Sequence, residues 1–91
     1  MQVIKRDGSK ENFNIEKIES AIAAAFLATN EVIPTGFMKR LRGVFDNISE
    51  ENIGIEQIQD TIEDVLLSSK CHKVSRAFIV YREKHKELRF I

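Results

Sequence analysis

Apolar residues recur at helical spacing in four separate stretches of the chain. In each stretch they stand three or four positions apart, which is the period of one face of an α-helix. We therefore predict helices over about 15–29 and 74–88, with two more between them. The predicted buried positions are Ile15, Ile18, Ile22, Ala25 and Phe26 in the first helix, Phe37, Leu41, Val44, Phe45 and Ile48 in the second, Ile55, Ile58, Ile62, Val65 and Leu66 in the third, and Val74, Ala77, Phe78, Tyr81 and Leu88 in the last.

Residues that favour helix starts stand near the ends of these stretches. Asn14 can accept a hydrogen bond from an unpaired backbone N–H of the first helix, and Thr35 can do the same for the second. Pro34 disfavours a helical conformation at the residue before it, so a connection separates these two helices. Gly54 permits a tight entry into the third helix, and Glu56 near its start complements the helix dipole.

The N-terminal segment predicts a β-hairpin. Gln2–Arg6 and Glu11–Phe13 lie on either side of Asp7-Gly8, and Asp-Gly is a strong hairpin signal. Ile53 is expected to form a third, short strand. Because a lone hairpin is marginal in water, it must pack on something. The predicted order is therefore β-β-α-α-(β)-α-α, an α+β fold in which four helices pack together and a small hairpin covers one end.

Length and composition bound the class of protein. Ninety-one residues, of which 43% are hydrophobic, form one small domain with one packed core. Apolar runs stay well below the roughly 18 residues of a membrane-spanning helix, and the first residues lack the pattern of a secretory signal. The single cysteine, Cys71, cannot form an internal disulfide, and with His72 it falls short of a zinc site. We therefore expect a cytoplasmic location and no membrane partner.

The charges cancel overall but are segregated along the chain. There are 14 basic and 14 acidic residues. Residues 46–64 include seven acids and no Lys or Arg, whereas residues 70–89 include seven basic residues and two acids. A neutral chain with basic ends argues against a general nucleic-acid coat. This segregation is compatible with a local anion-binding site where the two basic ends of the chain meet.

Four polar residues gather at the predicted junction between the hairpin and the first helix. Lys5 and Arg6 end the first strand, where alternation sends them to opposite faces. Lys17 stands one turn into the helix, where the dipole disfavours a cation and a phosphate would be favoured. Asn14 would lie at the mouth of the same site. The alternative is that these are ordinary solvated side chains, and the spacing alone leaves both interpretations open.

The sequence carries no evident catalytic motif. Its serines lack an obvious His or Asp partner, and the segment Gly-x-x-x-x-Gly-Lys-Ser/Thr of a P-loop is absent. We interpret His72 and His85 as surface groups. Asp60, Glu63 and Asp64 are interpreted as a solvated helix face rather than a metal site. We therefore expect neither a catalytic site nor a metal site built from side chains.

Several segments resemble one known family. The run Val3-Ile4-Lys5-Arg6-Asp7-Gly8-Ser9, followed by Glu11, Phe13, Lys17-Ile18 and Ala21-Ile22, closely resembles the start of the ATP-cone domain. Residues 55–63 look like the third helix of that family, and residues 77–82 resemble its closing helix. The resemblance identifies residues 1–91 as one ATP-cone domain. This regulatory module is found at the N-terminus of ribonucleotide reductases and in the repressor of their genes.

The resemblance implies a bundle of four helices capped by a small three-stranded β-sheet. It also implies ATP or dATP as an allosteric ligand between the hairpin and the helices, with Mg²⁺ held mainly by the phosphates. The contacts it implies are Val3 and Ile18 beside the adenine or ribose, Lys5 and Arg6 at the phosphates, Glu11, Asn14 and Lys17 as polar contacts, Gln59 near the base or a second nucleotide, and Arg82 as a phosphate contact from the last helix.

We therefore expect a nucleotide-binding regulatory domain without catalysis of its own. It would control the overall activity of a reductase, with the anaerobic class preferred, through oligomeric state or substrate binding. Because the pattern starts at Met1, an N-terminal segment of a longer enzyme is expected. Its partners would be the catalytic domain of the parent enzyme and other copies of itself, and nucleic acid is not expected.

Two alternative functions stay open. The first is the ATP cone of a transcriptional repressor of reductase genes. The second is a helical module that binds DNA or protein, with Lys39, Arg40 and Arg42 or the basic last helix as its contact surface.

Overall fold

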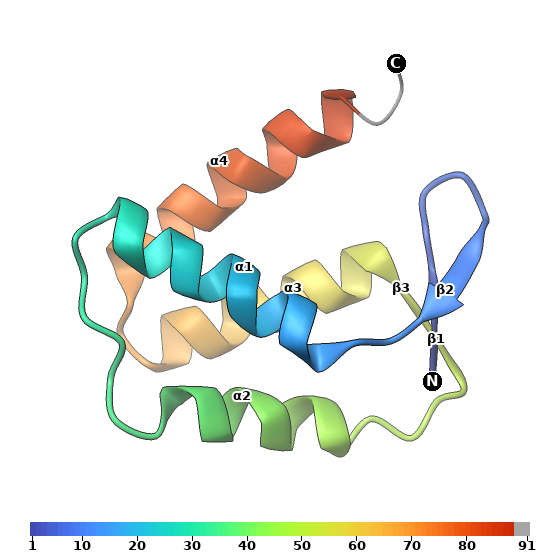
Figure 1. The fold of residues 1–91 in the computed structure, drawn as a ribbon, viewed down its shortest axis with the longest axis horizontal. Helices are drawn as coiled ribbons and strands as arrows, with labels where there is room; N and C mark the ends of the chain where they lie inside the picture. Colours follow the sequence, from blue (N-terminus) through green and yellow to red (C-terminus); the bar gives the residue numbers. More distant parts are fainter. Residues whose placement is uncertain (89–91) are drawn as a thin grey trace.

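The computed structural model describes the backbone of residues 1–88 and the side chains of residues 1–84. Within this part of the chain, four helices pack together and a three-stranded sheet lies at one end (Figure 1). The predicted fold class is therefore confirmed. In chain order the elements are β1 (Gln2–Ile4), β2 (Lys10–Asn12), α1 (Ile15–Ala28), α2 (Phe37–Asp46), β3 (Asn52–Gly54), α3 (Ile55–Ser68) and α4 (His72–Leu88).

The sheet has β1 in the middle, with the strand order β2-β1-β3. On one side Val3 lies opposite Glu11 in an antiparallel pair. On the other side Val3 lies opposite Ile53 in a parallel pair, which confirms the predicted third strand. Val3 is 6% exposed and Ile53 is 1% exposed, so this centre of the sheet belongs to the core. The small sheet therefore packs on the helices instead of standing alone in water.

The turn between β1 and β2 is longer than a two-residue hairpin loop. The N–H of Lys5 donates to the carbonyl of Ser9 at 2.8 Å, and the N–H of Gly8 donates to the carbonyl of Lys5 at 3.0 Å. The carboxylate of Asp7 accepts hydrogen bonds from the N–H and hydroxyl of Ser9. Gly8 has a φ of +85°, a conformation that favours glycine. Because β1 ends at Ile4, strand alternation does not set the direction of Arg6, contrary to the prediction.

Asn14 caps α1 as predicted, because its side chain accepts a hydrogen bond from the N–H of Glu16 at 3.0 Å. The predicted cap of α2 by Thr35 is wrong. Gly36 holds that position with a φ of +81°, and no side chain caps this end. The entry into α3 is tight as predicted, because β3 ends at Gly54 and α3 begins at Ile55. Glycine is not needed for it, since the φ of −74° at Gly54 is open to any residue.

The predicted stripes of α1, α2 and α3 supply most of the core. Figure 1 shows α1 and α3 in the middle, with α2 along one side and α4 crossing on the other. Phe26 and Phe37 meet edge to face with their ring centres 5.3 Å apart, which joins α1 to α2. The buried hydrophobic residues are Val3, Ile22, Phe26, Phe37, Leu41, Phe45, Ile53, Ile58, Ile62, Val65, Leu66, Val74 and Phe78.

The last helix differs from its prediction in two ways. It begins at His72, two residues before the predicted start at Val74. Tyr81, predicted to be buried, is 50% exposed. Val74 and Phe78 are buried as predicted, whereas the predictions for His85 and Leu88 concern side chains outside the described residues. Within residues 1–88, no helix has both the length and the apolar character that a bilayer crossing requires.

Candidate functional site

A pocket of about 200 Å³ opens where the sheet, α1, α3 and α4 meet. Its lining mixes apolar side chains with charged and amide groups, which is the usual composition of a ligand site. It is lined by Val3, Glu11, Asn12, Phe13, Asn14, Lys17, Ile18, Ala21, Ile55, Ile58, Gln59, Ile62, Phe78 and Tyr81.

Most of the residues singled out from the sequence line this pocket. They come from four elements and their connections, so the fold brings together positions that lie far apart in the chain. The predicted contact residues in the lining are Val3, Glu11, Asn14, Lys17, Ile18 and Gln59. Lys5, Arg6 and Arg82 are not lining residues, and each lies in an ion pair instead.

Lys5 lies beside the pocket because its ion-pair partner, Glu11, is a lining residue. Its ammonium group is 2.9 Å from the carboxylate of Glu11, and the two side chains are 40% and 41% exposed. Asn14 uses its side-chain oxygen to cap α1. The amide nitrogen of Asn14 is therefore the group that can meet a ligand in the pocket.

Arg6 is the most deeply buried cation near the pocket, with 10% of its side chain exposed. Its Nε donates to Glu56 at 2.7 Å, and its Nη2 donates to the side-chain oxygen of Gln59 at 3.2 Å. Its Nη1 is buried and finds no acceptor among the described residues. Because Gln59 lines the pocket, Arg6 lies at its edge with unused donor capacity.

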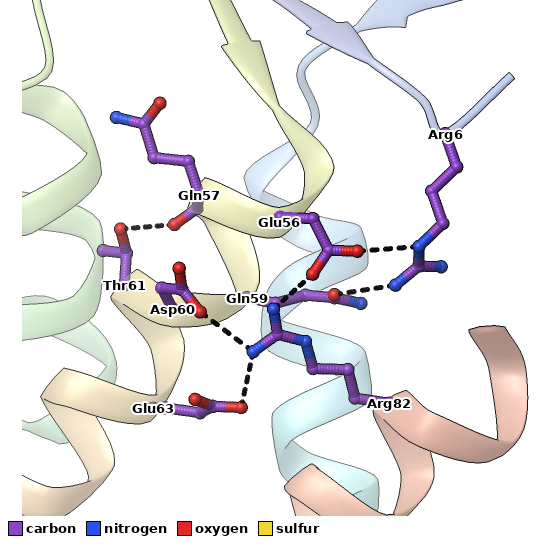
Figure 2. A network of polar contacts seen from close by, with 8 residues as sticks. All are labelled: Arg6, Glu56, Gln57, Gln59, Asp60, Thr61, Glu63 and Arg82. Atoms are coloured by element: carbon purple, nitrogen blue, oxygen red, sulfur yellow. Dashed lines mark hydrogen bonds and ion pairs between the residues drawn. The ribbon is translucent and has the colours of Figure 1, made fainter. Parts of the chain in front are cut away.

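Arg82 on α4 is held by three carboxylates of α3 (Figure 2). It donates to Asp60 at 2.9 Å, to Glu63 at 2.8 Å and to Glu56. Burial opposes the charge of Arg82, but the hydrogen bonds that it donates to Glu56, Glu63 and Asp60 outweigh this effect and raise its pKa. The hydrogen bond from Arg82, followed by that from Arg6, lowers the pKa of Glu56.

This network corrects the interpretation of the acidic face of α3. Asp60 and Glu63 bind Arg82, and the Glu63 side chain is only 19% exposed. The face is therefore a partner for α4 rather than a purely solvated surface. Among residues 1–84, no group of three His, Cys, Asp or Glu side chains is arranged to hold a metal ion.

Reasoning from the sequence missed the part of the pocket that α4 provides. Phe78 and Tyr81 were assigned to the core, but both line the pocket. They also line an adjoining hollow of about 290 Å³ between α1 and α4, together with the alanines of α1. The alanines at 21, 24, 25 and 28 are the signal that could have indicated this space, because small side chains leave room between helices.

A larger pocket of about 310 Å³ lies at the connections between α1 and α2 and between α3 and α4. It includes none of the predicted contact residues, and two of its charged groups, Glu31 and Lys73, form a pair at 3.7 Å. The pocket beside the sheet is the better candidate, because its lining joins a lysine, several amide side chains and three aromatic rings from several elements.

The cations of α2 are largely engaged within the chain. Arg42 donates to both carboxylate oxygens of Glu19 on α1, at 2.9 and 2.6 Å. Arg40 donates to the hydroxyls of Ser68 and Ser69. Two of the three residues proposed for a DNA-contacting surface are therefore used to hold α2 against its neighbours.

Comparison with known proteins identifies the family. The profile of the ATP cone domain matches residues 1–87. The fold of four helices and a small mixed sheet agrees with that match. The chain therefore belongs to the ATP-cone family, as its sequence motifs indicated.

The relatives are chains of ribonucleotide reductases. A vitamin B12-dependent ribonucleoside-diphosphate reductase of Thermoplasma acidophilum is 35% identical over 97% of this chain, which corresponds to 12% of the relative. An anaerobic ribonucleoside-triphosphate reductase of Haemophilus influenzae is 37% identical over 88% of this chain and 12% of its own length. A ribonucleoside-diphosphate reductase subunit alpha of Chlamydia pneumoniae is 37% identical over 89% of this chain and 9% of its own. This chain thus spans about a tenth of these relatives.

Proposed function

We propose that this chain binds ATP or dATP in the pocket beside the sheet and thereby regulates a ribonucleotide reductase. The observation that carries the proposal is the convergence of Val3, Glu11, Asn14, Lys17, Ile18 and Gln59 on one pocket. Membership of the ATP-cone family supports adenine nucleotide as the ligand. The three relatives named above support a reductase as the parent enzyme, and one of them is an anaerobic ribonucleoside-triphosphate reductase, the class expected from the sequence.

The chemistry of the lining fits a nucleotide. Val3, Ile18 and the rings of Phe78 and Tyr81 offer apolar surface for adenine or ribose. Lysine and arginine bind phosphate through charge-assisted hydrogen bonds. We assign this role to Lys17 in the lining and to Lys5 and Arg6 around it, whereas Arg82 is engaged by three carboxylates of α3. Any Mg²⁺ would be held mainly by the phosphates and water.

The size of the pocket predicts that α4 takes part in binding. Ligand pockets usually enclose roughly 300–1,000 Å³, whereas this pocket alone has about 200 Å³. The adjoining hollow shares Ala21, Phe78 and Tyr81 with it. A bound nucleotide would occupy this adjoining hollow or displace α4. A displacement of α4 would transmit nucleotide binding directly to a partner.

Regulation would follow from the preference of a nucleotide for one state of the parent enzyme. A ligand shifts a two-state equilibrium only by its differential affinity for the two states. ATP and dATP differ only at the ribose 2′-hydroxyl, so the pocket must respond to that group or to the sugar position. The output would be a change in self-association or in contacts with the catalytic domain.

Calorimetric titration of the chain with ATP and with dATP in Mg²⁺ tests this proposal. We expect saturable binding of at least one nucleotide and a rise in melting temperature, because a ligand that binds only the folded state stabilises it. The same titration with duplex DNA tests the alternative of a DNA-binding module. Binding of DNA without a response to millimolar nucleotide would overturn the proposal.

A further inference from the structure

The carboxylate of Glu56 joins two arginines from opposite ends of the sequence. Arg6 in the β1–β2 turn donates to one of its oxygens at 2.7 Å, and Arg82 on α4 donates to the other (Figure 2). Guanidinium groups bind carboxylate and phosphate with the same geometry. Glu56 therefore satisfies donors that would equally suit phosphate oxygens.

Arg6 is linked to the pocket through Gln59. Its Nη2 contacts Gln59, which lines the pocket. Its side chain is 10% exposed, and its Nη1 has no acceptor among the described residues. A buried donor without a partner is unfavourable, so a further acceptor from the pocket side would stabilise this arrangement.

We propose that Glu56 is a built-in competitor of the nucleotide phosphates for Arg6, and that it lowers the affinity of the pocket for a triphosphate. This inference rests on the proposed function, because it needs a phosphate at the edge of the pocket. A phosphate approaching Arg6 meets the negative charge of Glu56 on the same guanidinium. It must either displace that carboxylate from Nε or bind beside a like charge, and both weaken binding.

Arg82 positions Glu56, the proposed competitor. It holds Glu56 together with Asp60 and Glu63, so the carboxylate stays on α3 beside Arg6. Asp60 offers a matched control because it is an acid of the same helix that contacts Arg82 but, in the described part of the chain, not Arg6. The two acids therefore separate competition at Arg6 from a general loss of negative charge.

Titrations of Glu56→Gln, Asp60→Asn and the wild-type chain with ATP and with adenosine test the inference. At low salt, Glu56→Gln should bind ATP roughly fivefold more tightly, the scale of one nearby unit charge in water. The gain should shrink as salt is added, and adenosine affinity should not change. Asp60→Asn should stay within about twofold of wild type, because its exposed charge is screened.

The outcomes separate this inference from the proposed function. If the wild type binds ATP but Glu56→Gln binds it no more tightly, or gains equally for adenosine, the competitor role is wrong and the nucleotide site stands. If the wild type binds neither ATP nor dATP, the proposed function is wrong and the competitor role with it.

A second readout needs no variant at Glu56. The Nε–H resonance of Arg6 in the wild-type chain, assigned with Arg6→Lys, reports the hydrogen bond to Glu56. It should shift on addition of ATP and stay in place with adenosine. An Arg6 resonance that does not respond to saturating ATP would overturn the inference even if Glu56→Gln failed to fold.

Discussion

Lys5 and Glu11 form an ion pair of 2.9 Å across the hairpin, although each was expected to contact a nucleotide. Both side chains are about two-fifths exposed, at 40% and 41%. Exposed pairs of this kind contribute little to stability, because water competes for both charges. Lys5 can therefore leave Glu11 for a phosphate with little change in the free energy of folding.

We expect Lys5→Ala and Lys17→Ala each to weaken ATP binding by about 1–3 kcal/mol, the scale of a lost charged hydrogen bond. Their melting temperatures should stay close to wild type, because Lys17 is exposed and the Lys5 pair is weak. Calorimetry and thermal unfolding measure both effects. Lys39→Ala, an exposed lysine on α2 outside the pocket, is the control. Unaltered ATP affinity in both the Lys5 and the Lys17 variant would show that the site is misplaced.

The lowered pKa of Glu56 predicts that the folded chain loses stability in acid. Hydrogen bonds from Arg82 and Arg6 lower its pKa below the ordinary value of 4.5, so the folded state favours the ionised form. This contribution is complete above pH 4.5 and disappears as the pH falls through the lowered pKa. Glu56→Gln should therefore lose less stability than wild type between pH 5 and 3, measured by urea unfolding at each pH. Parallel pH curves for the two chains would contradict the assignment.

Ile53→Ala should destabilise the chain by about 2–5 kcal/mol, the range for truncating a buried aliphatic side chain. Ile53 is 1% exposed and pairs with Val3 at the centre of the sheet. Leu27→Ala is the matched control, because Leu27 on α1 is 79% exposed. Chemical denaturation of both variants measures the difference. Equal effects would show that β3 does not belong to the folded core.

Replacing two glycines by alanine, one at the start of α2 and one inside it, should change the stability of the chain in opposite directions. Gly36 has a φ of +81°, where an L-residue costs about 1–2 kcal/mol, so Gly36→Ala should destabilise the chain. Gly43 lies inside the helix, and an added β-carbon meets nothing within 4 Å. Gly43→Ala should therefore stabilise the chain by about 0.5–1 kcal/mol. Thermal unfolding distinguishes the two, and a stabilising Gly36→Ala would refute the assigned helix start.

Local patterns in the sequence were enough to find the elements. The spacing of Ile58, Ile62 and Leu66 defined the buried face of α3, and each is buried. The cap at Asn14 was found because a side-chain oxygen before an apolar stripe is a local signal. Thr35 failed as a cap because Gly36 follows it, and its left-handed conformation starts α2 one residue later.

The arginine network could not be found from the sequence. Arg6 contacts Glu56 across 50 residues, and Arg82 reaches the same acid from α4. Strand alternation was the wrong guide for Arg6, because the strand ends at Ile4 and a turn follows. Tyr81 was placed in the core because it fits the helical period, but it is 50% exposed and lines the pocket.

By itself the sequence determined the element order, the buried stripes of the first three helices, the third strand and the family. These features follow from periodicity and from motifs whose residues lie close together in the chain. Only the tertiary structure decided that six of the expected contact residues line one pocket, that Phe78 and Tyr81 complete it, and that Glu56 joins Arg6 to Arg82. The physical reason is that turns and helix packing set side-chain directions between distant segments, and no local pattern encodes them.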